Sequence, residues 1–233
     1  MTSRLLVAVI GMLSLLAAEP IGGSSLQQLP PDGTWAKSQV SITLAGQEVS
    51  ATWTARSVGQ TTHNGQPCRW IELQQESDSS GFPKMTWRCL VPEAEFGAGK
   101  HPLGKSVKVW QKIEGQDAQA VDSIEAKDYL FGALLKGPEQ NLRAEDAPEI
   151  VKWQKGDMEC QVIAGDSEGK LNGVIRVPIH HRIFRHPNAP FGMGGVHWVL
   201  TLGDGDQKQT VNVKMTLQDQ GTDAKAQLPE LGI

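Results

Sequence analysis

The sequence has no run of lysine or arginine residues and only a small excess of charge. It carries 22 basic and 26 acidic residues, which gives a net charge of −4. A protein that follows the phosphate backbone of a nucleic acid needs a basic stripe or patch. We therefore expect no nucleic-acid partner. With 39% hydrophobic and 21% charged residues, the chain nevertheless has the composition of a folded globular protein.

Beyond the N-terminal segment, the sequence also has no long apolar run. The N-terminal run, Leu5 to Leu16, follows Arg4 and precedes Ala17-Ala18. This order is typical of a signal peptide, and the run is short for a membrane span. We expect a signal peptide over 1–18, with an uncleaved anchor or buried helix as the alternative. The mature chain should then lie in the periplasm or outside the cell, with no integral membrane segment.

The sequence lacks the short motifs of nucleophilic and metal-dependent hydrolases. It contains no G-x-S-x-G, S-x-x-K or H-E-x-x-H pattern. The glycine-rich segment 192–195 leads into an expected strand, whereas a phosphate-binding loop opens a helix. The sequence therefore predicts no catalytic residue and no cofactor.

Cysteine is scarce, and its number is odd: Cys68, Cys89 and Cys160. In an oxidising compartment this usually means one disulfide and one spare thiol. A hairpin of strands over 68–75 and 85–91 would place Cys68 opposite Cys89 and Trp70 opposite Trp87. We predict a Cys68–Cys89 disulfide, with buried free thiols as the alternative.

Alternating apolar residues and turn signals predict a succession of β-hairpins. Strands over 35–44 and 49–58 are expected around a Gly46-Gln47 turn, with Leu44 opposite Val49. Asn64-Gly65 predicts a second tight turn, followed by a bulge in the flanking strands. Further hairpins are expected around Lys155-Gly156 and between strands at 196–202 and 211–217.

One helix is expected, over 124–136, where an apolar stripe is followed by Gly137-Pro138. The predicted fold class is mainly β, an antiparallel and strongly curved sheet forming an open half-barrel of successive hairpins with one or two short helices. A linker over 19–29 should lead into a single domain over 30–218, and a polar tail over 219–233 should fray.

Tryptophan is the prominent aromatic, with seven residues against one tyrosine, spread over nearly every expected strand. Tryptophans on one side of a curved sheet can line a concavity that holds an acyl chain or a sugar. They can equally pack a core. The residues predicted to contact a ligand are Trp53, Trp70, Trp87, Trp198 and His181.

Four of six histidines lie late in the chain, so a metal site has to be considered. His180 and His181 are adjacent in an expected strand and therefore point to opposite faces. Alternation with isoleucine and valine makes His181 the inward one. A trio of His181, His186 and His197 is the alternative site, for an exported metal-dependent hydrolase.

The order of elements, long hairpins, then Leu90-Val91-Pro92-Glu93, a central helix and more hairpins, resembles the LolA and LolB type of periplasmic lipoprotein carriers and receptors. The resemblance covers most of residues 30–218. It implies an open half-barrel whose apolar concavity holds acyl chains. The cysteine pair and the histidine-rich strand depart from that pattern, so no binding residue is transferred.

Together these observations predict an exported, non-enzymatic protein that holds an apolar or lipid-like ligand in a tryptophan-lined concavity. Its partner would be a lipid, an acyl chain or a lipoprotein. The alternatives are the histidine-dependent hydrolase and a β module that binds carbohydrate or protein without a deep pocket.

Overall fold

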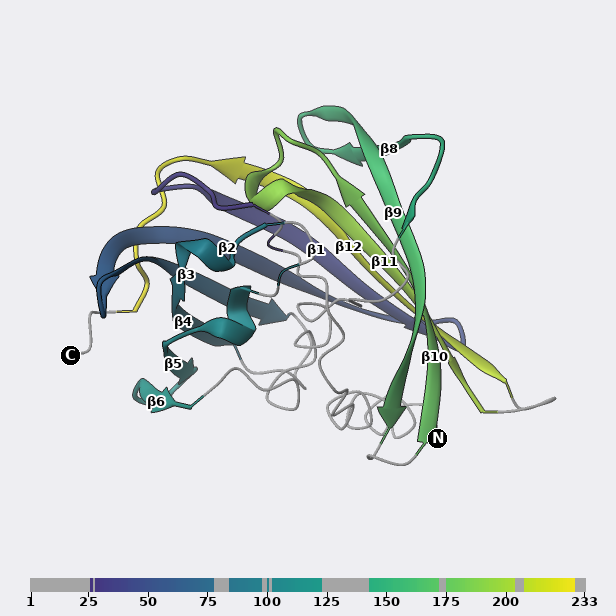
Figure 1. The fold of residues 1–233 in the computed structure, drawn as a ribbon. Helices are drawn as coiled ribbons and strands as arrows, with labels where there is room; N and C mark the ends of the chain where they lie inside the picture. Colours follow the sequence, from purple (N-terminus) through teal and green to yellow (C-terminus); the bar gives the residue numbers. More distant parts are fainter. Residues whose placement is uncertain are drawn as a thin grey trace.

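A computed structural model describes residues 26, 28–77, 84–97, 100, 102–122, 143–171, 175–203 and 208–228. These residues form a single antiparallel sheet of twelve strands (Figure 1). The strands are β1 (Trp35–Leu44), β2 (Gln47–His63), β3 (Gln66–Ser77), β4 (Met85–Pro92), β5 (Lys108–Ile113), β6 (Gln119–Val121), β7 (Arg143–Ala144), β8 (Glu149–Trp153), β9 (Gly156–Leu171), β10 (Ile175–Arg185), β11 (Met193–Leu202) and β12 (Gln209–Gly221). The short helical turns described are η1 (Glu93–Glu95), η2 (Pro102–Lys105) and η4 (Pro190–Gly192).

The sheet is a meander whose first and last long strands meet in its middle. Its order is β6-β5-β4-β3-β2-β1-β12-β11-β10-β9-β7, with β8 paired to β9. Strands β1 to β6 and strands β8 to β12 each pair with the next strand in sequence, and β12 returns to pair with β1. Among the described strands, the two ends of the order, β6 and β7, do not pair, so the sheet is open. The predicted antiparallel, hairpin-based β architecture is thus confirmed, whereas the predicted helix over 124–136 lies outside the described residues.

The first hairpin forms with a different turn from the one predicted. Ala45 and Gly46 both have positive φ, at 48° and 78°, which is the backbone of a type I′ turn with glycine at its second central position. Leu44 therefore faces Gln47, and Ile42 faces Val49. The predicted pairing of Leu44 with Val49 is wrong by two residues. A shift of two keeps every side chain on its face.

The hairpin between β8 and β9 differs in the same way. Its turn is Gln154-Lys155, so Trp153 faces Gly156 and Val151 faces Met158, two residues from the predicted register. The Asn64-Gly65 turn is as predicted, with His63 opposite Gln66. The expected bulge follows in β2, between Ser57 and Gln60.

One face of the sheet, here called the apolar face, carries the main hydrophobic core. Directly opposed residues of antiparallel strands lie on the same face of the sheet. Because apolar residues oppose one another from strand to strand, the core is continuous from β4 through β1 and β12 to β10. Its sheet residues include Val40, Ile42, Trp53, Ile71, Leu73, Trp87, Cys89, Ile179, Ile183, Trp198, Val213 and Leu217.

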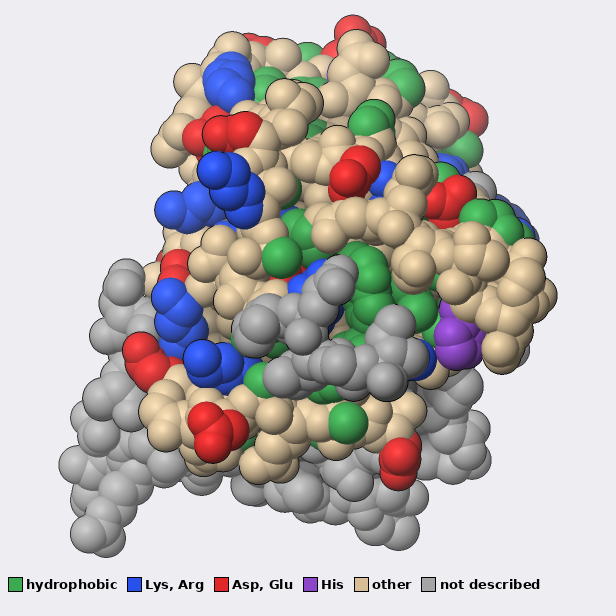
Figure 2. Space-filling view, turned by 90° about the vertical axis from the view of Figure 1, so that its left-hand side faces the viewer, with side chains coloured by type: hydrophobic (Ala, Val, Ile, Leu, Met, Phe, Trp, Pro, Cys, Tyr) green, Lys and Arg blue, Asp and Glu red, His purple; other side chains and the backbone are tan. Residues whose placement is uncertain are grey.

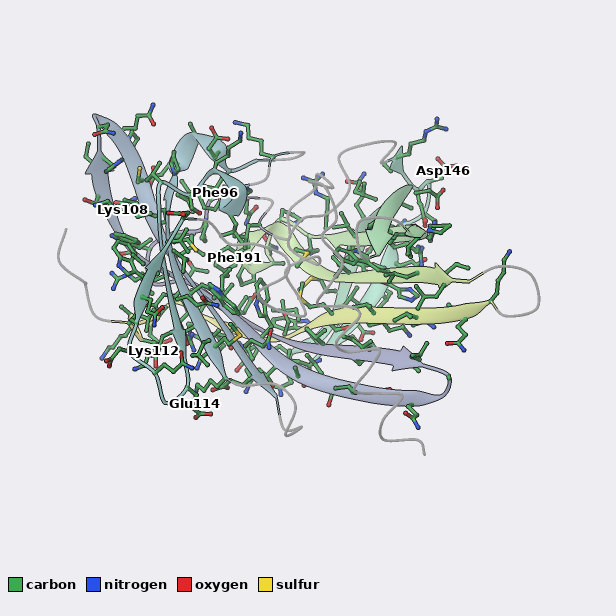
Figure 3. The ribbon with its side chains drawn as sticks, turned by 90° about the horizontal axis from the view of Figure 1, so that it is seen from below. Phe96, Lys108, Lys112, Glu114, Asp146 and Phe191 are labelled. Atoms are coloured by element: carbon green, nitrogen blue, oxygen red, sulfur yellow. The ribbon has the colours of Figure 1, made fainter. Side chains whose placement is uncertain are left out.

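Segments outside the sheet pack onto the apolar face. Phe96, after η1, and Phe191, in η4, are both buried in its core cluster and lie between the two halves of the sheet in Figure 3. Leu26 is 1% exposed and belongs to the same cluster. The backbone N–H of Gln28 donates to the carbonyl of Phe191, which ties the N-terminal segment to η4.

The other side of β2, β3 and β4 is here called the opposite face, and the C-terminal segment 222–228 packs on it at Glu72 and Arg88. The carboxylate of Glu72 accepts hydrogen bonds from the backbone N–H groups of Gln227 at 2.7 Å and Leu228 at 3.0 Å. Arg88 donates to the carbonyl of Leu228 at 2.6 Å. The expectation that the chain frays after Gln218 is therefore wrong as far as Leu228.

Candidate functional site

The apolar face brings together four of the five residues predicted to contact a ligand. Trp53, Trp87 and Trp198 belong to its core cluster, and His181 lies directly opposite Trp198 in the register of β10 and β11. The His181 and Trp198 rings meet edge to face, with centroids 5.2 Å apart. Sequence alternation correctly made His181 the inward histidine, since it is 1% exposed.

Trp70 does not join them. It lies on the opposite face in a separate cluster with Cys68 and Leu90, and its ring centroid is 5.2 Å from that of Trp110. The guanidinium carbon of Arg88 lies 4.9 Å from the Trp70 centroid. Trp70 therefore lies on the other side of the sheet from Trp53, so the two rings cannot contact one ligand.

The register of β3 and β4 explains which face of the sheet Trp70 and the two cysteines of these strands occupy. Cys89 faces Ile71, Trp87 faces Leu73, and Cys68 faces Pro92. This differs by three residues from the predicted register, and an odd shift exchanges the two faces of a strand. Cys68 thus lies on the opposite face and Cys89 on the apolar face, so the predicted disulfide is not formed.

All three cysteines are free and buried. Burial raises the pKa of Cys160 to about 11 and also raises the pKa of Cys68 and Cys89, so that each is a protonated thiol at neutral pH. We expect thiol labelling of denatured, unreduced protein to report three thiols. A count of one would restore the disulfide.

The alternative histidine trio is not assembled. His197 faces Arg182 across β10 and β11 and neighbours Trp198, which puts it on the other side of the sheet from His181. His186 follows β10 and lines a cleft of about 510 Å³ with Glu159, Gln161, Arg185 and Gln28. Within the described ranges, no group of three or more His, Cys, Asp or Glu side chains is placed to hold a metal ion.

A row of polar side chains crosses the apolar face, and sequence reasoning did not find it. Ser38 in β1 faces Trp53 in β2, and Trp53 faces Gln75 in β3. Their exposed fractions are 6%, 4% and 1%. In the part of the chain that the structure describes, neither Trp53 Nε1 nor Gln75 Oε1 has a hydrogen-bond partner. Gln75 is flanked on its other side by Met85.

The electrostatics of the apolar face disfavour charge. Desolvation, and to a smaller extent the nearby His180, lower the pKa of His181 to about 4, while Asp166 opposes the shift. His181 is therefore neutral at neutral pH. At one end of β3, Arg69 is paired with Glu93 at 3.0 Å, so its charge is already balanced. A neutral, largely apolar molecule suits such a surface better than an ion does.

Comparisons with known proteins give only weak resemblances. No family model and no curated protein matches the chain. A DUF1329 family protein from Desulfovibrio piger matches over 98% of this chain and 94% of its own, at 7% identity and a TM-score of 0.32. A structure of MucB in complex with MucA(peri) covers 82% and 94%, at 11% identity and a TM-score of 0.17. A Pseudomonas aeruginosa MucA/MucB complex covers 93% and 99%, at 10% identity and 0.18. Scores this low carry no inference about fold family or function.

Among the residues that the structure describes, no helix is long and apolar enough to cross a membrane. On the side shown in Figure 2, basic and acidic side chains are interspersed, and hydrophobic side chains gather near the middle.

Proposed function

We propose that this chain is an exported, non-enzymatic binding protein that holds an apolar or lipid-like ligand against the apolar face of its sheet. The observation that carries the proposal is the composition of that face. One continuous hydrophobic surface extends over both halves of an open sheet, and it includes Trp53, Trp87 and Trp198. Large aromatic side chains with a few fixed polar groups are typical of ligand sites.

The proposal includes a strongly curved sheet, an open half-barrel, as the form that brings the two halves of the apolar face toward one ligand. Phe96 and Phe191 support it, because they come from different loops and pack on the same cluster. A ligand there would be an acyl chain, a lipid or the lipid part of a lipoprotein. The N-terminal apolar run supports export to the periplasm or the cell exterior.

A matched pair of tryptophan variants tests this function. We expect Trp53→Ala to weaken binding of a fluorescent acyl-chain probe about tenfold, which corresponds to about 1.4 kcal/mol. Trp70→Ala removes an equally large and similarly buried ring from the opposite face, so it should leave the affinity of the folded fraction unchanged. Both variants should also lose about 3–5 kcal/mol of stability, because each deletes a buried indole.

Probe affinity is measured by fluorescence titration at a temperature where both variants remain folded, and stability by chemical denaturation. Native mass spectrometry of the unmutated chain, expressed with its export segment and purified from the cell envelope, should reveal a co-purified apolar molecule. Equal affinity losses in the two variants, or no probe binding by the unmutated chain, would show that the tryptophans only pack a core.

A further inference from the structure

The polar row on the apolar face is energetically out of place in a protein without a ligand. An amide buried without a hydrogen bond costs about 1–3 kcal/mol, and a buried indole N–H without an acceptor adds to that cost. Gln75 lies between Trp53 and Met85, both core residues. Neither Trp53 Nε1 nor Gln75 Oε1 is bonded to the other or to another described group. The two atoms therefore lack an acceptor and a donor, respectively.

The geometry indicates that one group could satisfy both atoms. Directly opposed residues on neighbouring antiparallel strands hold their Cβ atoms about 5 Å apart. Trp53 and Gln75 are such a pair, and Ser38 extends the row onto a third strand. A secondary or primary amide presents a carbonyl acceptor and an N–H donor within this span. An ester presents only the acceptor, and a hydrocarbon presents neither.

From this complementarity we infer that the row Ser38, Trp53 and Gln75 is the polar subsite for a neutral amphiphile whose apolar chain ends in an amide. This inference rests on the proposed function and names its ligand class. The amide carbonyl accepts from Trp53 Nε1, and the amide N–H donates to Gln75 Oε1. The hydroxyl of Ser38 provides a further polar neighbour, and the apolar chain lies along the surrounding core residues. A carboxylate is disfavoured, because both groups offered to it are neutral and one is an acceptor.

Three probes with one chain length test the subsite: dodecanamide, methyl dodecanoate and dodecylbenzene. On the unmutated chain, we expect the amide to bind about fivefold to tenfold more tightly than the ester, the gain from one additional neutral hydrogen bond. Gln75→Met should abolish this preference by weakening amide binding alone. Trp53→Phe keeps a ring but removes the N–H, so it should weaken amide and ester alike and leave dodecylbenzene unchanged.

The neighbouring residue provides a matched control. Gln74 lies on the opposite face, is also buried, and donates to Glu76 at 3.1 Å. Gln74→Met should therefore leave all three affinities unchanged. Stability gives a second readout, since Gln75→Met removes an amide oxygen that has no partner among the described residues and should not lower the denaturation midpoint of the unliganded chain.

The possible outcomes separate this inference from the proposed function. Equal binding of amide and ester, or an amide preference that survives in Gln75→Met, would overturn the polar subsite while leaving the apolar-ligand function standing. Absence of binding by all three probes would overturn both. A large loss of stability in Gln75→Met would show that Gln75 has a structural partner, and it would also overturn the subsite.

Discussion

Replacing Glu72 with alanine is expected to lower the free energy of unfolding by about 3–5 kcal/mol, the range for breaking one partner of a buried ion pair. Glu72 is fully buried, faces Arg88 across β3 and β4, and accepts the two backbone N–H groups of Gln227 and Leu228. Its removal leaves those donors without an acceptor and takes away a carboxylate that interacts electrostatically with the buried Arg88. Chemical denaturation of the variant and the unmutated chain measures the difference.

Glu76 is the matched control on the same strand. It forms an ion pair with Lys84, and both side chains are more than 40% exposed. Exposed pairs contribute at most about 1 kcal/mol, and the single hydrogen bond from Gln74 contributes about as much, so Glu76→Ala should cost clearly less than Glu72→Ala. If Glu72→Ala costs no more than Glu76→Ala, the C-terminal segment is not held by Glu72. Removing 222–233 should in turn destabilise the chain, because it takes away the hydrogen-bond partners of the buried Glu72 and Arg88.

Acidification from pH 7 to pH 4 is expected to destabilise the protein by roughly 3 kcal/mol through His181 alone. Burial lowers its pKa in the folded state to about 4, from an ordinary value of 6.5. In that window the unfolded chain binds a proton that the folded chain does not. The stability due to neutral His181 is therefore full above pH 6.5 and is lost as the pH falls toward 4.

Substitutions can distinguish the contribution of His181 to this pH dependence from the contributions of other titrating groups. His197 also has a lowered pKa from burial and adds a loss in the same direction, whereas the raised pKa of Glu72 acts in the opposite direction. We expect His181→Gln to remove most of the loss, measured as the free energy of unfolding at several pH values. His180→Gln makes the same chemical change at the neighbouring residue, which is exposed and lies beside Asp166. This variant should still lose stability on acidification. Identical pH profiles for the two variants would contradict the assignment.

Several parts of the fold could be predicted because alternation and turn chemistry act locally. The Asn64-Gly65 turn, the inward position of His181 and the alternating strands β11 and β12 all follow from neighbouring residues. The turns at 45–46 and 154–155 were placed one residue too late. In each segment, a two-residue turn can be placed at more than one position. Moving the turn by one residue shifts the strand pairing by two residues and leaves every side chain on the same face, so the hydrophobic pattern fits both positions.

The site was only partly accessible from the sequence. Trp53, Trp87 and Trp198 share a face as expected, since each lies on a strand whose core side includes them. Gln75 could not have been selected, because a single polar residue near the end of a strand gives no sign of the face it occupies. Its burial depends on Trp53 and Met85, which lie on the two neighbouring strands and not beside it in the sequence.

By itself, the sequence determined an antiparallel β protein built of hairpins, because alternation, tight-turn residues and the scarcity of helical patterns act over short distances. Only the tertiary structure decided the faces of β3 and β4. Every described residue of β4 is buried, and so are Cys68 through Gln75 in β3, so neither strand alternates. The physical reason is that the core covers one side, whereas the cluster around Trp70 and the C-terminal segment each cover part of the other. The C-terminal segment lies more than 130 residues from Arg88 in the chain. No local sequence pattern can predict a contact between residues so far apart.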